Sequence, residues 1–169
     1  EHLSWEEIFK VRKLKTADYT FSLPLKIGAI LAGAKNKSLK AIDNYGEPVG
    51  IAFQIKDDML GVFGDPKVTG KSNESDIKEG KKTFLYAKAK EVVNKKDGKY
   101  LEKWYGSDKL TKARIENIRK IIKESGALSY SENLARELVE KGKKRIPDIT
   151  KVKKYQKILS DLADSMVER

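Results

Sequence analysis

Two adjacent aspartates and a glutamine stand where a predicted helix runs into a loop, and they could carry out metal chemistry. Gln54, Asp57 and Asp58 are spaced so that on a helix the glutamine shares a face with the carboxylates. Aspartates at a helix C-terminus repel one another and oppose the helix dipole, and a bound cation relieves both costs. Mg²⁺ prefers oxygen ligands and is commonly shared between one or two carboxylates and substrate phosphates. The pattern predicts a magnesium site, against the plainer alternative that both aspartates only solvate a helix end.

The segment that follows these carboxylates supplies further charged groups. Residues 61–81 are rich in Gly, Pro, Ser, Asn and Asp, have no apolar period, and contain Asp65, Lys71, Asp76 and Lys81. A loop of that length in a compact domain is usually functional or disordered. Lysines can pair with phosphate oxygens, and carboxylates can orient the lysines or a metal ion. We therefore predict a phosphate-binding loop at 61–81.

The elements that must position these groups are helices. Apolar residues recur every three or four positions through most of the chain, and strand-like alternation is nearly absent. We expect an all-α helical bundle in a single domain over residues 1–169. A capping box at Ser4 predicts a helix that begins near Trp5. Further helices are expected over 19–33 and 38–58, disturbed by Pro24 and Pro48, and over 84–93, 100–105, 109–125, and around 134–139 and 152–166.

Composition narrows the class of protein. The 36 Lys and Arg residues exceed the 25 Asp and Glu residues, which gives a net charge of +11. Because lysines and acids are mixed along the chain, we expect solvated helix faces and no nucleic-acid partner, although such a field also attracts diphosphates. The absence of cysteine excludes disulfides and favours a reducing cytoplasm. No apolar stretch approaches the roughly 20 residues of a membrane span, so the chain is not expected to span one.

Two motifs resemble those of a known family. Residues 50–71, GIAFQIKDDMLGVFGDPKVTGK, continue to SDIKEGK at 75–81 and resemble the second aspartate-rich region of the trans-isoprenyl diphosphate synthases, which include the farnesyl and geranylgeranyl diphosphate synthases. Upstream, LKTADYT at 14–20 resembles the Lys-Thr helix of that family. The order and separation of the motifs also match. The resemblance implies the C-terminal half of the isoprenoid-synthase helical bundle.

The resemblance also implies a role for each matching position. The diphosphate of the allylic substrate would be bound by Lys15, Lys71 and Lys81. Mg²⁺ would be ligated by Asp57 with Asp58 in support, and Asp65 and Asp76 would act from outside that shell. Catalysis would depend on Lys15, with Thr16 and Gln54 turning oxygen dipoles toward the allylic carbocation. The pocket would be lined by Phe53 and Tyr19, although both also have the spacing of ordinary core residues, and Lys81 could be an ordinary helix-start lysine.

The sequence departs from the family in two places. Gly61 stands where the family often has a third aspartate. The first aspartate-rich motif and the arginines that bind isopentenyl diphosphate do not occur in these residues. We therefore expect a half-enzyme that condenses an allylic diphosphate with isopentenyl diphosphate once a partner chain supplies the N-terminal half, in a homo- or hetero-oligomer, with residues 61–81 as an active-site lid. The alternative is a non-catalytic regulatory or scaffold subunit of a heteromeric synthase.

Overall fold

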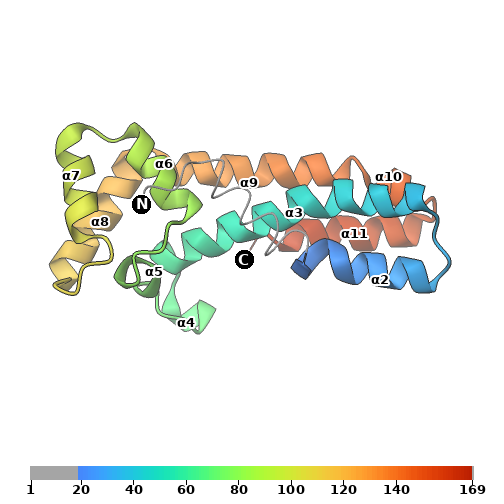
Figure 1. Ribbon diagram of the computed structural model, residues 1–169, viewed down its shortest axis with the longest axis horizontal. Helices are drawn as coiled ribbons and strands as arrows, with labels where there is room; N and C mark the ends of the chain where they lie inside the picture. Colours follow the sequence, from blue (N-terminus) through green and yellow to red (C-terminus); the bar gives the residue numbers. More distant parts are fainter. Residues whose placement is uncertain (1–18, 169) are drawn as a thin grey trace. The chain divides into compact units, whose positions relative to one another are not determined.

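The computed structural model describes residues 19–168, and every regular element in this part of the chain is helical (Figure 1). The all-α prediction is therefore confirmed. The helix expected from Trp5 and the Lys15-Thr16 pair lie outside the described residues. The described chain divides into two compact units, one formed by residues 55–132 and the other by residues 19–54 with residues 133–168. Helices α3 (Asn36–Phe63) and α9 (Ala127–Lys143) each contribute to both units.

The unit of residues 55–132 is built on three helices that begin at side-chain caps. They are α6 (Phe84–Val92), α7 (Lys95–Trp104) and α8 (Lys112–Glu124), and the hydroxyl or amide oxygens of Thr83, Asn94 and Thr111 accept hydrogen bonds from their first turns. On α8 the inward residues are the isoleucines that the helical period picks out. The core also includes Leu85, Leu101 and Ile77.

Helix α7 is longer than the sequence predicts. It begins at Lys95, whereas the apolar pattern indicated only 100–105. Its first turn contains two lysines, Asp97 and Gly98 but no large apolar residue, so periodicity gives no signal there. The Asn94 cap, whose Oδ1 accepts from the Asp97 amide at 3.0 Å, starts the helix instead.

The segment predicted as a structureless loop at 61–81 is partly helical. Helix α3 continues to Phe63, and two single-turn helices follow, α4 (Pro66–Thr69) and α5 (Ser75–Lys78). Asp65 caps α4 by accepting from the Lys67 amide at 2.9 Å, and Pro66 occupies the first turn, where its missing N–H has no consequence. Helix α4 buries no residue and α5 only one large apolar residue, Ile77, so no apolar period marks either turn.

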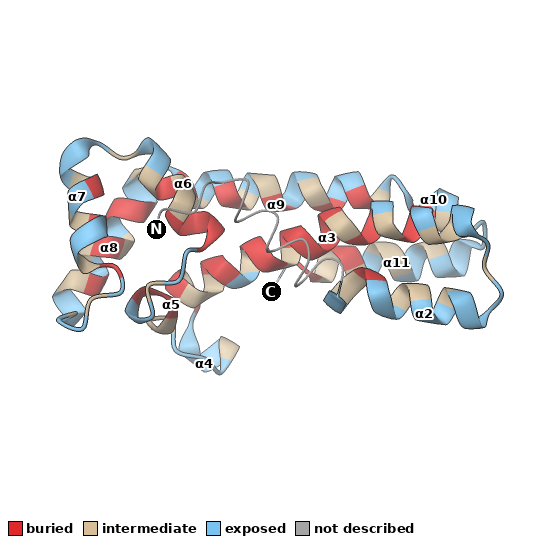
Figure 2. Cartoon of the chain, in the orientation of Figure 1, coloured by how far each residue is buried: buried red, intermediate tan, exposed pale blue. Residues whose placement is uncertain are grey.

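The second unit contains α2 (Leu23–Leu31), the first part of α3, the end of α9, α10 (Ile146–Ile149) and α11 (Lys153–Ser165). Residues 19–22, immediately before α2, are π-helical, so Pro24 lies where the helical stretch changes from π to α, which is a disturbance of the kind predicted there. Pro48, by contrast, lies inside α3, which continues through it. Buried positions recur along α3 (Figure 2), among them Tyr45 and Val49, each with no exposed surface.

Close backbone contact joins α9 to α3 in this unit. A Cβ atom on Gly142 would lie 2.5 Å from a methyl group of Val49 and 3.0 Å from the Tyr45 carbonyl oxygen. Glycine is therefore required at this position for the two helices to approach so closely. The Tyr45 hydroxyl donates a 2.7 Å hydrogen bond to the Leu159 carbonyl, which connects α3 to α11 as well.

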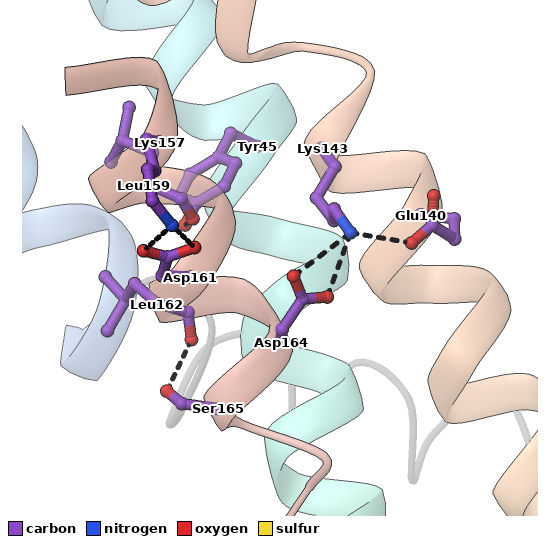
Figure 3. Close-up of polar contacts among 9 residues, drawn as sticks. All are labelled: Tyr45, Glu140, Lys143, Lys157, Leu159, Asp161, Leu162, Asp164 and Ser165. Atoms are coloured by element: carbon purple, nitrogen blue, oxygen red, sulfur yellow. Dashed lines mark hydrogen bonds and ion pairs between the residues drawn. The ribbon is translucent and has the colours of Figure 1, made fainter. Parts of the chain in front are cut away.

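A half-buried lysine completes the packing of this unit. Lys143 on α9 donates to both carboxylate oxygens of Asp164 on α11, at 2.9 and 3.1 Å, and to Glu140 at 3.0 Å (Figure 3). These hydrogen bonds, first to Asp164 and then to Glu140, raise the pKa of Lys143 above its ordinary value. Asp164 also acts on Tyr45, whose pKa is raised first by burial and then by this negative charge.

We predict that Lys143→Met lowers the free energy of unfolding by about 1 kcal/mol, because it leaves Asp164 without its cation. Urea unfolding followed by circular dichroism measures this. The matched control is Lys157→Met, which breaks an exposed pair with Asp161 within α11 and should cost less than about 0.5 kcal/mol. Because the folded-state pKa of Lys143 is raised, its contribution is complete below the ordinary lysine value of 10.5 and is lost as pH rises through the folded value. Equal losses for both variants would contradict the assignment.

Candidate active site

The two adjacent aspartates lie in the last two turns of α3, which continues to Phe63 and so does not end at Asp58 as the sequence predicted, and they face different surroundings. Asp58 is 2% exposed, and its Oδ2 accepts a 3.0 Å hydrogen bond from the backbone N–H of Phe84, the first residue of α6. That amide is one of the donors that a helix N-terminus leaves without an intrahelical partner, and a carboxylate there is also favoured by the helix dipole. Asp58 therefore fixes where α6 starts relative to α3.

Asp57 is exposed, in contrast to its neighbour. Within residues 19–168 it has no hydrogen bond or ion pair to another side chain. Gln54, one turn earlier on the same helix, is 9% exposed. The helix thus directs one carboxylate into the protein and leaves the adjacent one available to a ligand from solvent.

Asp76 and Lys81 form the second polar contact of the site. Asp76 is 7% exposed, and its Oδ1 lies 2.5 Å from Lys81 Nζ. This hydrogen bond is the main cause of a raised pKa for Lys81, which stays protonated and half exposed. Lys81 therefore presents a cation that a buried carboxylate holds in position.

Gly61 explains how that carboxylate reaches α3. A Cβ atom at Gly61 would lie 2.3 Å from Asp76 Oδ2 and 2.7 Å from its Cγ, so no larger residue fits without displacing Asp76. Gly61 is the position at which the family often has a third aspartate. Here a carboxylate from α5 occupies the space beside that position, which gives the departure a physical reason.

Arg119 on α8 is a residue of the site that sequence reasoning missed. Its Nε donates to the Val62 carbonyl at 2.8 Å and its Nη2 to the Asn73 carbonyl at 2.9 Å, and Nη1 pairs with Glu116. The guanidinium thus holds the end of α3 and the segment between α4 and α5 together. No local pattern distinguishes this arginine, because both acceptors are backbone carbonyls distant in sequence.

Asp65 and Lys71, the other two site residues predicted within 61–81, lie at the surface. Asp65 is exposed and caps α4, so its observed contact is structural. Lys71 is exposed in the turn after α4, where its backbone N–H and C=O both contact the Thr69 hydroxyl. Within the described residues the exposed Lys71 side chain makes no ion pair, so a phosphate group can reach it.

The remaining predicted residues belong to the other unit or are not described. Phe53 is half-buried on α3, and Tyr19 is 72% exposed. Lys15 and Thr16 lie outside the described residues. The structure therefore brings together Asp58, Asp76 and Lys81 around the end of α3 in one unit, and the roles carried over to the other positions remain predictions.

The donor set fits a magnesium ion that is shared with a substrate. Within residues 19–168 no cluster of three or more His, Cys, Asp or Glu side chains could hold a metal alone. Asp57 offers a solvent-facing carboxylate, and one oxygen of Asp58 is occupied by the Phe84 amide. Mg²⁺ commonly takes one or two carboxylates and completes its octahedron with water and substrate phosphates, so two aspartates suffice only when a phosphate ligand is present.

Comparison with known proteins identifies the family of the chain. Residues 1–122 match the Polyprenyl synthetase family. The chain is 40% identical over 147 residues to a geranylfarnesyl diphosphate synthase of Aeropyrum pernix, covering 85% of this chain and 44% of that protein. It is 34% identical over 165 residues to a geranylgeranyl diphosphate synthase of Saccharolobus solfataricus, covering 97% of this chain and 49% of that one.

Solved structures give the same result. The crystal structure of a Corynebacterium glutamicum geranylgeranyl pyrophosphate synthase, complexed with isoprenyl diphosphate and magnesium, superposes with a TM-score of 0.92 at 34% identity, covering 99% of this chain and 48% of that one. A Pyrococcus horikoshii geranylgeranyl pyrophosphate synthetase gives a TM-score of 0.86 at 33% identity, with 99% and 50% covered. The chain belongs to the polyprenyl synthetase family, with the all-α isoprenyl synthase fold. It spans about half the length of the relatives it matches.

We predict that Asp58→Ala lowers the free energy of unfolding by about 2 kcal/mol, because it removes a charged acceptor and leaves the Phe84 amide buried without that partner. Asp57→Ala, which removes an exposed carboxylate from the same helix turn, should change it by less than about 0.5 kcal/mol. Urea unfolding of both variants provides the comparison. Similar effects of the two substitutions would contradict the division between an inward and an outward carboxylate.

We also predict that Gly61→Ala costs about 1–3 kcal/mol, because the added methyl group displaces the Asp76 carboxylate. The matched control is Gly28→Ala on α2, where a Cβ atom would meet nothing within 4 Å. That substitution should be neutral or stabilising, since alanine is the better helix former. The thermal midpoints of the two variants test this, and a harmless Gly61→Ala would show that Asp76 does not depend on this contact.

Proposed function

We propose that this chain supplies one half of the active site of a trans-prenyl diphosphate synthase that condenses an allylic diphosphate with isopentenyl diphosphate. The observation on which this rests is the exposed Asp57 carboxylate next to the buried Asp58, on a chain that belongs to the polyprenyl synthetase family. A solvent-facing carboxylate and a lysine held by a buried acid, as Lys81 is by Asp76, are groups that suit a metal-bound diphosphate.

In the proposed reaction the residues of this chain bind and orient the leaving group. Lys71 and Lys81, with Lys15, would hold the diphosphate, and Asp57, with Asp58 in support, would hold Mg²⁺ against its oxygens. The bound ion supplies charge neutralisation as the allylic C–O bond breaks and the diphosphate departs with the electron pair. Thr16 and Gln54 would then present oxygen dipoles to the allylic cation, with the faces of Tyr19 and Phe53 nearby.

The remaining steps conserve atoms without an external oxidant or base. The double bond of isopentenyl diphosphate attacks the allylic carbon, one C–C bond forms, and a proton leaves the resulting cation, with the released diphosphate as its acceptor. Water would capture the cation at any stage, so the site must exclude it. Residues 61–81 lie between the two partners of the Asp58–Phe84 hydrogen bond, with Arg119 bound to Asn73 in their middle, and they are the segment we assign to that covering role.

The proposed enzyme is completed by the part of the fold that this chain does not span. Helix α2 supports this proposal: none of its residues is buried, and Ile27, Ile30 and Leu31 are 50%, 57% and 85% exposed. A helix so apolar is normally covered in a finished protein. The complement would be the region that the relatives have beyond the matched half, and we place the reaction in the cytoplasm because the chain has no cysteine.

The test is a magnesium-dependent condensation assay on the chain alone and on the complex with a polypeptide that carries the other half of the fold, each with its native mass determined. We predict turnover only in the complex. In that complex Asp57→Ala should lower kcat by at least about a hundredfold, since charge stabilisation of the leaving group is lost. Asp108→Ala removes another exposed aspartate of the same unit, one with no role in the proposed site; it is the matched control and should leave kcat unchanged.

Each outcome separates the proposal from its alternative. Turnover by the chain alone would contradict the need for a complement. A stable complex in which Asp57→Ala retains full activity would favour the regulatory or scaffold role, because the carboxylate would then have no part in the chemistry.

A further inference from the structure

The net charge of the chain is concentrated at one place in the fold. Residues 141–157 contain eight Lys and Arg residues and one acidic residue, Asp148, so a segment of 17 residues accounts for +7 of the total of +11. The segment includes the end of α9, α10 and the first turn of α11, all in the unit of residues 19–54 and 133–168. We call residues 141–158 the basic corner. Helices α10 and α11 are in contact there.

Most cations of the basic corner are not neutralised by the protein. Lys143 pairs with Asp164, and Lys157 pairs with Asp161 (Figure 3). Five others are exposed and have no carboxylate partner within the described part of the chain: Lys141, Lys144, Arg145, Lys153 and Lys154. Ion pairs with neighbouring helical residues account for Lys143 and Lys157. The charges of the other five residues remain available to an anionic partner.

Apolar side chains are exposed among these cations. Val152, Tyr155 and Ile158 are 52%, 54% and 51% exposed, although α11 buries other apolar residues such as Ala163. Tyr155 and Ile158 are three residues apart and therefore adjacent on the helix surface, and Lys154 is four residues before Ile158. Figure 2 shows the start of α11 mostly as exposed surface. Here apolar and cationic side chains thus alternate on one exposed helix face.

We propose that the basic corner binds the surface of an anionic lipid bilayer. A helix that exposes aliphatic and aromatic residues between lysines matches the interface of such a bilayer, because the apolar groups enter the boundary of the acyl chains while the cations meet lipid phosphates. Nucleic acid would match the lysines alone, since aliphatic groups gain nothing from a phosphate backbone. No helix within residues 19–168 is long and apolar enough to cross a membrane, so the contact is peripheral. This proposal does not depend on the proposed function.

The experiment is flotation of the purified chain with vesicles of phosphatidylcholine alone and with vesicles that also contain phosphatidylglycerol. We expect binding only to the anionic vesicles, weakened by salt. The variant Lys144→Glu, Lys153→Glu, Lys154→Glu should bind at least about a hundredfold more weakly, because each basic residue near an anionic surface contributes about a fivefold gain in partitioning. The matched control is Lys95→Glu, Lys96→Glu, Lys99→Glu on α7. These three lysines are also exposed and the variant has the same total charge, so it should retain binding.

A second variant tests the apolar part of the proposal. Val152→Ser, Tyr155→Ser and Ile158→Ser together leave the charge unchanged and should reduce vesicle binding at least about tenfold, since apolar burial then contributes nothing. Circular dichroism and the thermal midpoint establish that each variant is folded. Equal loss in the α7 control, no effect of the serine substitutions, or binding of duplex DNA in preference to anionic vesicles would each overturn the proposal.

Discussion

The hydrogen bond from the Phe84 amide to the Asp58 carboxylate is the contact on which the candidate site depends. It joins the end of α3 to the start of α6 across 26 positions of the sequence, in a buried setting. A buried carboxylate without donors would be costly, and a buried helix N-terminus without acceptors would be costly too, so each satisfies the other. The segment between them is thereby anchored at both ends, and Arg119 fixes its middle.

The same contact gives the adjacent aspartates different functions. Successive residues on a helix point about 100° apart, so two neighbouring carboxylates can face different surroundings, as Asp57 and Asp58 do. The Asp58 carboxylate accepts a hydrogen bond from the first residue of α6, whereas the Asp57 carboxylate remains exposed. Their mutual repulsion is reduced because one is hydrogen-bonded to a helix N-terminus, and a cation shared with a diphosphate would reduce it further. A structural acid therefore positions a functional one.

The sequence predicts the elements better than their long-range contacts. Helical periodicity locates α6, α8 and α11 because each buries an apolar stripe, as the isoleucines of α8 show. It misses the start of α7 and the turn α4, where a side-chain cap or a proline starts the helix with little apolar burial, and it misses α5, whose one large buried apolar residue, Ile77, is too little to form a period. It cannot predict that Asp76 occupies the space beside Gly61, because that contact depends on how α5 returns to α3. Motifs identify the residues, but only the tertiary structure shows which carboxylate faces inward.

The distribution of charged residues along the chain says more about a binding partner than the net charge does. Over the whole chain lysines and acids are mixed, which indicates ordinary solvated helices, yet +7 of the charge lies in residues 141–157. Most acids of the site unit are committed to hydrogen bonds or ion pairs, as Asp76 is with Lys81, and so offset nearby lysines. The basic corner has few acids to do the same, and it adds apolar residues that the described part of the chain leaves exposed. Solvation alone favours lysines on a surface but not aliphatic side chains among them, so the combination points to a partner that is both anionic and apolar.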